Sequence, residues 1–365
     1  MSRELSIYLD LLRFLAAVAV MLSHVSSQSF SGGFLWPCTR LGVPAVIVFF
    51  VLSGYVIGHS VAQPGRTARS YIIARGARLY SVVLPALLLT ILLDGIGMHS
   101  DARVYAGFVP VLAEAWSLPL VLLFLNEAWG GFEGIGLGSN GPYWSLGYEA
   151  PFYLLFGIAW YRRGRTRLLL LALAGLVAGP IVLVMFPMWL LGFALFRSGN
   201  ALVPTPRMGL WMVGTTALAV AAILASHEAA VDLADHRGSE IVTDYAIALL
   251  FLVHLAGFTG LAPRLAPLLM RVEKPVRWLA GGTFTLYLLH QPVATCFKAL
   301  SPWSADSPWF RAGMILLPFV LCYAVAGVTE RRAHAWRARI ETGLRWLRHT
   351  WAGTLVFPPL LRALR

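Results

Sequence analysis

Residues 8–25, YLDLLRFLAAVAVMLSHV, have the length and apolar composition of a membrane-spanning helix, yet they contain Asp10, Arg13 and His24. An ionisable group at the centre of a bilayer costs a few kcal/mol and usually faces a cavity or a partner. The eleven positions from Arg13 to His24 amount to three helical turns plus about 20°, with a rise of about 16 Å. Both side chains therefore project from nearly one face.

This stripe of the first helix predicts a line of functional groups along a pore or cavity. Arg13 falls in the inner half of the span and His24 in the outer half, while Asp10, three residues before Arg13, is placed to pair with it. The alternative interpretation is that Arg13 only extends to the membrane surface and His24 makes a polar contact between helices.

Composition extends this interpretation to the whole chain. Of the 365 residues, 58% are hydrophobic and 13% are charged, whereas a soluble domain has about 25% charged residues. Apolar stretches of spanning length recur throughout. We therefore predict an all-α polytopic membrane bundle of about ten transmembrane helices, at residues 7–28, 41–61, 80–98, 143–161, 167–185, 187–200, 207–226, 241–260, 278–299 and 309–328.

The net charge of +12 follows the predicted topology. With the N-terminus inside, most of the 29 Lys and Arg residues fall on the inner side. This bias places both termini in the cytoplasm and predicts a multi-pass protein of the inner (plasma) membrane. Because orientation explains the basic charge, nucleic acid is not an expected partner. The outer side keeps Arg40, Arg103, Arg237, Lys298 and Arg311.

Three segments depart from the pattern of spanning helices. Residues 104–125 are apolar but contain Pro110, Glu114 and Pro119, and we interpret them as a re-entrant or interfacial element. The glycine-rich run that follows, through residue 141, is expected to be a flexible outer rim. We assign residues 1–330 to one integral-membrane domain, and residues 331–365 to a basic amphipathic cytoplasmic tail lying on anionic membrane lipids.

Cysteine and histidine spacing predicts neither a metal site nor a disulfide framework. The three cysteines are far apart in the sequence, and Cys296 and Cys322 fall in predicted spans. The first apolar segment contains ionisable residues and has no small-residue cleavage pattern after it, so we expect a retained helix.

Arg75 and Arg78 lie three residues apart in RTARSYIIARGARLY, the segment that leads into the third predicted span. They share one helix face at the inner membrane surface, where two guanidinium groups suit bidentate binding of a phosphate. The alternative is that they only mark the topology of an inner loop.

Two further ionisable groups lie within predicted spans. Glu149 lies in GPYWSLGYEAPFYLLFG and His290 lies in TFTLYLLHQPVATCF. Counted at 1.5 Å per residue, His24, Glu149 and His290 fall in one layer of the outer half of the bilayer, within about 10 Å. We expect all three to line the outer half of one cavity, with Arg13, Arg75 and Arg78 at its inner mouth. A bracing hydrogen bond between helices is the alternative for Glu149.

These elements, in this order, resemble the integral-membrane acyltransferase 3 family, which includes O-acetyltransferases of bacterial polysaccharides. The resemblance rests on LDLLRFLAAVAVMLSHV, FFVLSGYVI, the Arg75/Arg78 pair, PYWSLGYEAPFY and TLYLLHQPV. It implies ten helices with cytoplasmic ends, an acyl-CoA donor from the cytoplasm, a sugar acceptor, an essential His24 and a required Arg75/Arg78 pair. Ala150 stands where many members have an acidic or polar residue beside the glutamate.

The expected activity is transfer of an acyl group, in the first place acetyl, from acyl-CoA to a hydroxyl of a cell-envelope, exported or lipid-linked glycan. His24 would act as general base or as a transient acyl carrier. Arg13 with Asp10, and Arg75 with Arg78, would bind the donor, which is a substrate, so no bound cofactor is expected. Glu149 and His290 would position the acceptor or relay protons. The alternatives are a transporter or flippase of a lipid-linked sugar, and an acyltransferase acting on an antibiotic or a lipid.

Overall fold

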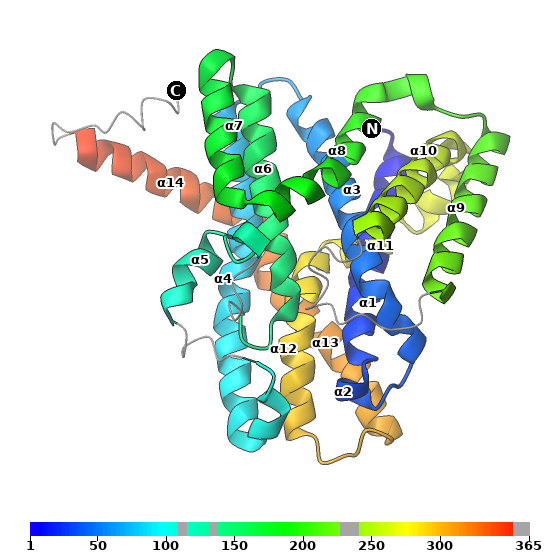
Figure 1. The fold of residues 1–365 in the computed structure, drawn as a ribbon, viewed down its shortest axis with the longest axis vertical. Helices are drawn as coiled ribbons and strands as arrows, with labels where there is room; N and C mark the ends of the chain where they lie inside the picture. The colour runs from blue at the N-terminus through cyan, green and yellow to red at the C-terminus, as the bar shows by residue number, and fades with distance from the viewer. Residues whose placement is uncertain (109–114, 131–136, 227–240, 353–365) are drawn as a thin grey trace.

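The computed structural model describes residues 1–108, 115–130, 137–226 and 241–352, whose regular secondary structure is entirely helical. Ten of the described helices correspond in order to the ten predicted spans (Figure 1). They are α1 (Arg3–Val25), α3 (Gly42–Val61), α4 (Ala68–Ser100), α6 (Leu146–Tyr161), α7 (Gly164–Ala178), α8 (Pro180–Ser198), α9 (Pro206–Ser226), α10 (Ile241–Arg271), α12 (Thr283–Leu300) and α13 (Pro308–Val328).

Seven of the described helices are long and apolar enough to cross a membrane, which confirms the all-α polytopic bundle. α6 and α7 are shorter, with 16 and 15 residues. α12 has 18 residues, and its middle carries His290 and Gln291, both of which are buried by protein. These two polar residues of α12 therefore belong to the interior of the bundle.

The predicted boundary between the fifth and sixth spans is wrong. We placed it at residues 185–187, whereas the chain turns at Gly179, between α7 and α8. Gly179 has φ +83°, and a Cβ there would lie 2.5 Å from the backbone nitrogen of Trp129. Pro180 then begins α8, and because the N–H groups of the first turn have no acceptor within the helix, its lack of an N–H loses no hydrogen bond.

α4 begins twelve residues earlier than the predicted third span. Thr67 caps it, since its Oγ1 accepts a hydrogen bond from the Ser70 backbone N–H, and Ser70 Oγ accepts one from the Thr67 backbone N–H. Arg75 and Arg78 therefore lie inside a continuous helix. The ninth predicted span, residues 278–299, is also divided, because Gly281 and Gly282 separate α11 (Glu273–Ala280) from α12.

No spanning helix occurs in the described part of residues 104–125. These residues form two 3-10 turns and the five-residue α5 (Leu118–Leu122), while residues 109–114, with Pro110 and Glu114, lie outside the described residues. The glycine-rich run after them is not an exposed rim at residues 137–140, all of which are buried. Ser139 is fully buried, and its backbone N–H and hydroxyl donate hydrogen bonds to Asp94 of α4. Residues 131–136 of the run are outside the described residues.

α3 and α8 pack backbone against backbone. A Cβ on Gly54 would lie 1.9 Å from the Trp189 carbonyl oxygen, and a Cβ on Gly192 would lie 1.9 Å from that of Val51. Each glycine thus admits the opposite helix at a distance that no side chain permits.

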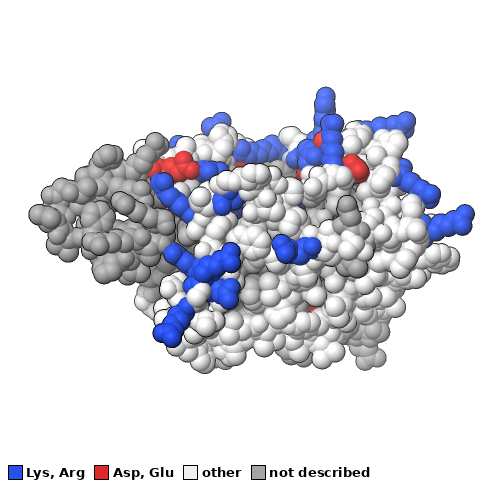
Figure 2. Space-filling view, turned by 90° about the horizontal axis from the view of Figure 1, so that it is seen from above, with Lys and Arg blue, Asp and Glu red and all other residues white. Residues whose placement is uncertain are grey.

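Five helices, α1, α3, α4, α6 and α12, surround the centre of the bundle (Figure 1). After α13, the turn at Glu330–Arg332 leads into α14 (Ala333–Ala352), which contacts α4 and projects from the side of the bundle. The end of the bundle at which the N-terminus lies carries many more Lys and Arg than Asp and Glu (Figure 2).

Candidate active site

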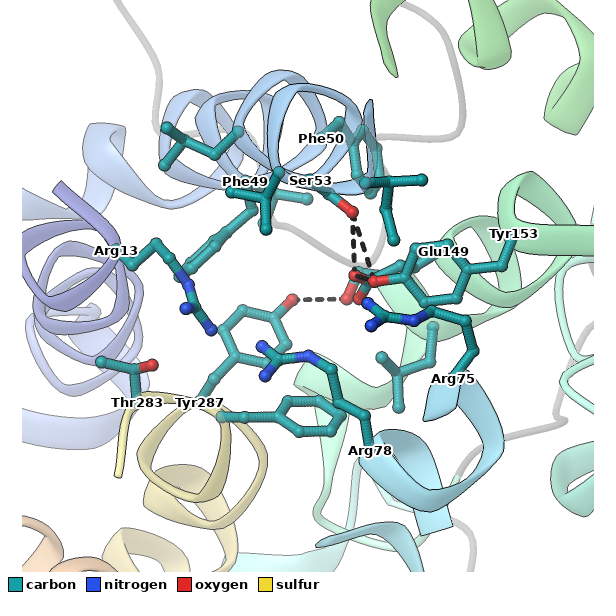
Figure 3. Close-up of a pocket in the computed structure, with 17 residues that line it drawn as sticks. Arg13, Phe49, Phe50, Ser53, Arg75, Arg78, Glu149, Tyr153, Thr283 and Tyr287 are labelled. Carbon is teal, nitrogen blue, oxygen red and sulfur yellow. Dashed lines mark hydrogen bonds between the residues drawn. The ribbon is translucent and has the colours of Figure 1, made fainter. Parts of the chain in front are cut away.

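A cavity of about 200 Å³ lies between the five central helices. On α3 its lining runs from Val46 to Ile57, a rise of about 16 Å, so the cavity is elongated along this helix. Phe49 and Phe50 contribute an apolar wall, and arginines from α1 and α4 contribute a charged one (Figure 3). The pocket therefore has one apolar wall and one positively charged wall.

The cationic side consists of Arg13, Arg75 and Arg78. Figure 3 shows the guanidinium groups of Arg13 and Arg78 turned toward one another across the cavity. The guanidinium of Arg78 lies 5.7 Å from the ring of Phe284, and that of Arg75 lies 5.7 Å from the ring of Tyr153. Among the described residues, neither Arg75 nor Arg78 forms an ion pair with a carboxylate. Such a site is suited to an anion.

Asp10 is placed as the spacing on α1 predicts, 3.7 Å from Arg13 Nη1. It has a second partner that the sequence did not indicate, since Arg277 Nη1 donates to Asp10 Oδ2 at 2.8 Å. Arg277 and Arg3 both bind Glu273, at 2.9 and 2.6 Å. A chain of alternating charges thus runs from the surface of α11 to the pocket.

Glu149 lines the same pocket as the three arginines, in the first turn of α6. Its Oε1 accepts hydrogen bonds from the hydroxyls of Tyr153 and Ser53, the latter at 3.3 Å. Trp189 donates its indole N–H to Ser53 Oγ at 3.1 Å. The carboxylate is therefore held by neutral donors at the wall of the pocket.

His24 and His290 form a pair outside the lining of this pocket. His290 Nε2 lies 3.1 Å from His24 Nδ1, and the ring centroids are 5.0 Å apart. Each Nδ1 also lies within hydrogen-bond distance of the carbonyl one turn back, that of Val20 at 3.0 Å and that of Leu286 at 2.9 Å. Because a carbonyl only accepts, each Nδ1 carries the proton, and the basic atom of His24 is Nε2.

The expectation that His24, Glu149 and His290 together line the outer half of one cavity is thus wrong, because neither histidine is among the residues that line the pocket. Glu149 lies with Arg13, Arg75 and Arg78, and the two histidines lie together apart from the pocket. The depth assigned to Glu149 assumed a span starting at the membrane surface, near residue 143. α6 starts only at Leu146, and the turn before it is itself buried, with Pro142, Tyr143 and Ser145 enclosed.

Tyr153, Tyr287 and Ser145 also line the pocket, and none of them is among the candidates from the sequence. Tyr153 is four residues after Glu149, and Tyr287 is three residues before His290, spacings that place each on its neighbour's helix face. The Tyr287 hydroxyl donates to Ser145 Oγ at 2.7 Å, across the pocket (Figure 3). Helical periodicity from the two candidate residues indicates both tyrosines, whereas nothing local in the sequence indicates the contact with Ser145.

Glu330 caps the N-terminal end of α12. Its carboxylate accepts hydrogen bonds from the backbone N–H groups of Phe284 and Thr285, at 3.1 and 3.0 Å. A carboxylate at a helix N-terminus satisfies donors that have no partner within the helix and complements the helix dipole. Since Thr283 and Phe284 line the pocket, Glu330 fixes part of its wall.

A comparison with protein families identifies the family of this chain. A family model described as an acyltransferase domain matches residues 6–327, nearly the whole chain. The chain belongs to the acyltransferase 3 family. All seven candidate site residues fall within the matched region.

Two curated relatives match parts of the chain. It is 35% identical to Acyltransferase MdmB of Streptomyces mycarofaciens over 190 residues, 48% of this chain and 46% of the relative. It is 29% identical to Nodulation protein 10 of Rhizobium leguminosarum bv. viciae over 183 residues, 46% of this chain and 48% of the relative. The chain therefore spans about half the length of the curated relatives it matches. No solved structure matches it significantly.

Proposed function

We propose that this protein transfers an acyl group, in the first place acetyl, from cytoplasmic acyl-CoA to a hydroxyl of a cell-envelope or exported glycan. The family and the name of one relative support acyl transfer in general. The observation that carries the proposal is the pocket itself, in which three arginines face one carboxylate. This surplus of positive charge is suited to a polyanionic donor.

The orientation that the proposal needs is supported by charge. The face with the N-terminus is rich in Lys and Arg, as a cytoplasmic face is in the inner (plasma) membrane (Figure 2). The three arginines lie toward this end of their helices, because α1 and α4 both start there (Figure 1). A donor made in the cytoplasm would therefore reach them first.

On the donor side, Arg13, Arg75 and Arg78 would hold anionic groups of acyl-CoA. Asp10 would fix the guanidinium of Arg13, with Arg277 holding Asp10 in turn. Glu149 would keep Tyr153 in place, and the Tyr153 ring is the surface over which Arg75 lies. Glu149 would thus act on the donor side, whereas its sequence position led us to expect that it positions the acceptor or relays protons.

On the acceptor side, His24 would act as general base. Its Nε2 would take the proton from the glycan hydroxyl while the hydroxyl oxygen attacks the thioester carbonyl. Collapse of the tetrahedral intermediate breaks the carbon–sulfur bond, and His24 returns the proton to the leaving thiolate, giving an O-acyl ester and CoA. His290 Nε2 would accept the Nδ1 proton of His24 as a hydrogen bond and so stabilise the imidazolium.

One experiment tests the proposal. The purified protein in lipid nanodiscs is incubated with radiolabelled acetyl-CoA and a panel of glycans, and acetylated glycan and released CoA are measured together. We expect equal amounts of both products, and about 10²- to 10⁴-fold slower formation of both with the His24→Ala variant. Movement of a lipid-linked sugar across proteoliposomes without acetyl-CoA, and without ester formation, would favour the transporter instead.

A further inference from the structure

The arginines occupy only one end of the elongated cavity. Arg75 lies over the ring of Tyr153, and the guanidinium groups of Arg13 and Arg78 are turned toward one another (Figure 3). On α6, Tyr153 is seven residues, or about 10 Å, beyond Leu146, which lines the same cavity. The lining at Leu146 is therefore remote from the place where Arg75 lies.

α12 shows the same division of the cavity. Arg78 lies over the ring of Phe284, in the first turn of this helix. Tyr287, three residues further along α12, donates its hydroxyl hydrogen bond to Ser145, the residue directly before Leu146. Two helices thus place the cations at one end of the cavity and Leu146 at the other.

The end of the cavity opposite the arginines is lined by four apolar side chains, those of Val46, Phe49, Phe50 and Leu146, which we call the apolar end. Val46 and Leu146 are almost completely buried, with 2% and 1% of their surfaces exposed. Phe50 packs against the ring of Phe152, with centroids 5.2 Å apart. Packed protein therefore bounds the cavity at this end.

The apolar end is shallow. On α3, Ser53 donates to Glu149 and so marks the level of the carboxylate, and Phe49 lies about one turn before it. Phe49 contacts the Tyr287 ring, with centroids 5.7 Å apart. Val46, the first residue of α3 that lines the cavity, is only three residues before Phe49, a rise of about 4.5 Å. The depth beyond Phe49 is thus about one helical turn.

The chemistry of the apolar end selects its occupant. A hydroxyl-rich glycan would lose hydrogen bonds with water there, because the neighbouring polar side chains, those of Ser145 and Tyr287, already bind one another. A donor whose phosphates lie at the arginines points its opposite terminus toward this end. In an acyl-CoA that terminus is the acyl chain, which is apolar. A depth of one helical turn accommodates an acetyl or a propionyl group but not the chain of a fatty acid.

We propose that the apolar end binds the acyl chain of the donor, and that Val46 and Leu146 determine specificity by limiting the length of this chain. The inference rests on the proposed function and deepens it, since it makes the donor a short-chain acyl-CoA. With the chain in place, the thioester lies at the level of Phe49, next to the contact of Tyr287 with Ser145. Chain length is therefore selected before the acyl group is transferred.

The test uses the intact protein in nanodiscs and measures dissociation constants by calorimetry. The ligands are CoA and three of its thioethers, S-ethyl-CoA, S-propyl-CoA and S-hexyl-CoA, which cannot lose their chains. Val46→Ala enlarges the apolar end, Val46→Leu fills it, and Leu146→Ala enlarges it from α6. Val48→Ala is the matched control, because it is the same substitution at a residue of α3 that does not line the cavity. Thermal unfolding identifies the variants that are folded.

For the wild type, we expect affinity to rise about fourfold from S-ethyl-CoA to S-propyl-CoA, the effect of burying one more methylene. S-hexyl-CoA should bind about tenfold more weakly than S-propyl-CoA, because the surplus methylenes do not fit. Val46→Ala and Leu146→Ala should each remove this loss, and Val46→Leu should weaken binding of S-propyl-CoA about tenfold. CoA, which has no chain, should bind equally to all variants, and Val48→Ala should match the wild type throughout.

The same dependence on chain length in Val46→Ala, Leu146→Ala and the wild type overturns the acyl-binding site while leaving the proposed function standing. Wild-type binding of S-hexyl-CoA as tight as that of S-propyl-CoA also overturns it. Equal changes for CoA and the thioethers do so too, because they indicate a general change in the pocket. A wild-type protein that binds neither CoA nor any thioether overturns the proposed function and the acyl-binding site together.

Discussion

The hydroxyl of Tyr287 donates a 2.7 Å hydrogen bond to Ser145 Oγ, joining α12 to the start of α6. Tyr287 is the last residue of α12 that lines the arginine pocket, and His290 follows three residues later. The edge of Phe49 packs against the same ring, with centroids 5.7 Å apart. Under the proposed mechanism the thioester has to pass this contact to reach His24.

Replacing Tyr287 with Phe removes the hydrogen bond and keeps the ring. We expect hydrolysis of acetyl-CoA in the absence of acceptor to rise roughly 2- to 12-fold, since one neutral hydrogen bond contributes about 0.5–1.5 kcal/mol. The measurement is release of CoA by the variant in nanodiscs. Tyr80→Phe, which loses a hydrogen bond to the Leu122 carbonyl away from this pocket, is the control. Unchanged hydrolysis would show that the contact does not limit access to His24.

His24→Ala should reduce acyl transfer by about 10²- to 10⁴-fold, the usual effect of removing a general base. CoA binding should persist, because His24 does not line the arginine pocket. Product formation and CoA affinity are measured on the same preparation, with His99→Ala, an exposed histidine of α4, as the control. Near-normal turnover by His24→Ala would remove His24 from the mechanism.

Arg78→Lys keeps the charge but loses the planar guanidinium with its paired donors. We expect donor affinity to fall about tenfold, while the orientation in the membrane stays the same. Arg163→Lys, in the turn between α6 and α7, is the matched substitution away from the pocket. If CoA binds equally to both variants, Arg78 does not bind the donor and contributes only to the orientation of the protein in the membrane.

Glu273→Gln should lower the melting temperature at pH 7 by roughly 1–3 °C. Hydrogen bonds from Arg3 and Arg277 lower the pKa of Glu273 from its ordinary value of 4.5. A lowered pKa in the folded state stabilises the fold above the ordinary value, and this stabilisation is lost as the pH falls through the lowered one. The difference between variant and wild type should therefore shrink below pH 4.5. Glu4→Gln is the control, and a difference independent of pH would contradict the ion pairs.

Gly54→Ala should destabilise the protein by about 1–3 kcal/mol, because the added methyl group overlaps the Trp189 carbonyl. Gly214→Ala in α9, where a Cβ meets nothing within 4 Å, should be neutral or stabilising by up to about 1 kcal/mol. Thermal unfolding in detergent compares the two. Equal melting temperatures would mean that α3 and α8 separate easily.

Hydrophobic length and charge predict most of the fold, because both follow from transfer of segments into the bilayer. They fail where the chain turns inside the bundle. The turn at Gly179 and the start of α6 at Leu146 depend on Trp129 and on the buried Ser139–Asp94 contact, which come from distant parts of the sequence. The position and length of apolar segments do not predict such long-range contacts.

For the candidate site too, contacts within one helix can be predicted from the sequence, whereas contacts between distant segments cannot. Helical spacing predicts the Asp10–Arg13 pair, since both residues lie on one helix. It cannot predict that Arg277 shares Asp10 or that Glu330 caps α12, because these partners are 267 and 46 residues away. The predicted depth of Glu149 is wrong for a related reason, since a polar, glycine-rich run is expected to be solvent-exposed, whereas residues 137–140 of it are buried.

The backbone contact of Gly54 and Gly192 has a consequence for redesigning the pocket. Between α3 and α8 no side chain separates the two backbones at these positions, so neither helix can slide or tilt to absorb a new neighbour. A substitution at Phe49 or Val56 on the pocket side of α3 therefore changes the shape of the cavity directly. Engineering for longer or shorter acyl chains should start from this fixed wall, with α4, α6 and α12 left to adjust.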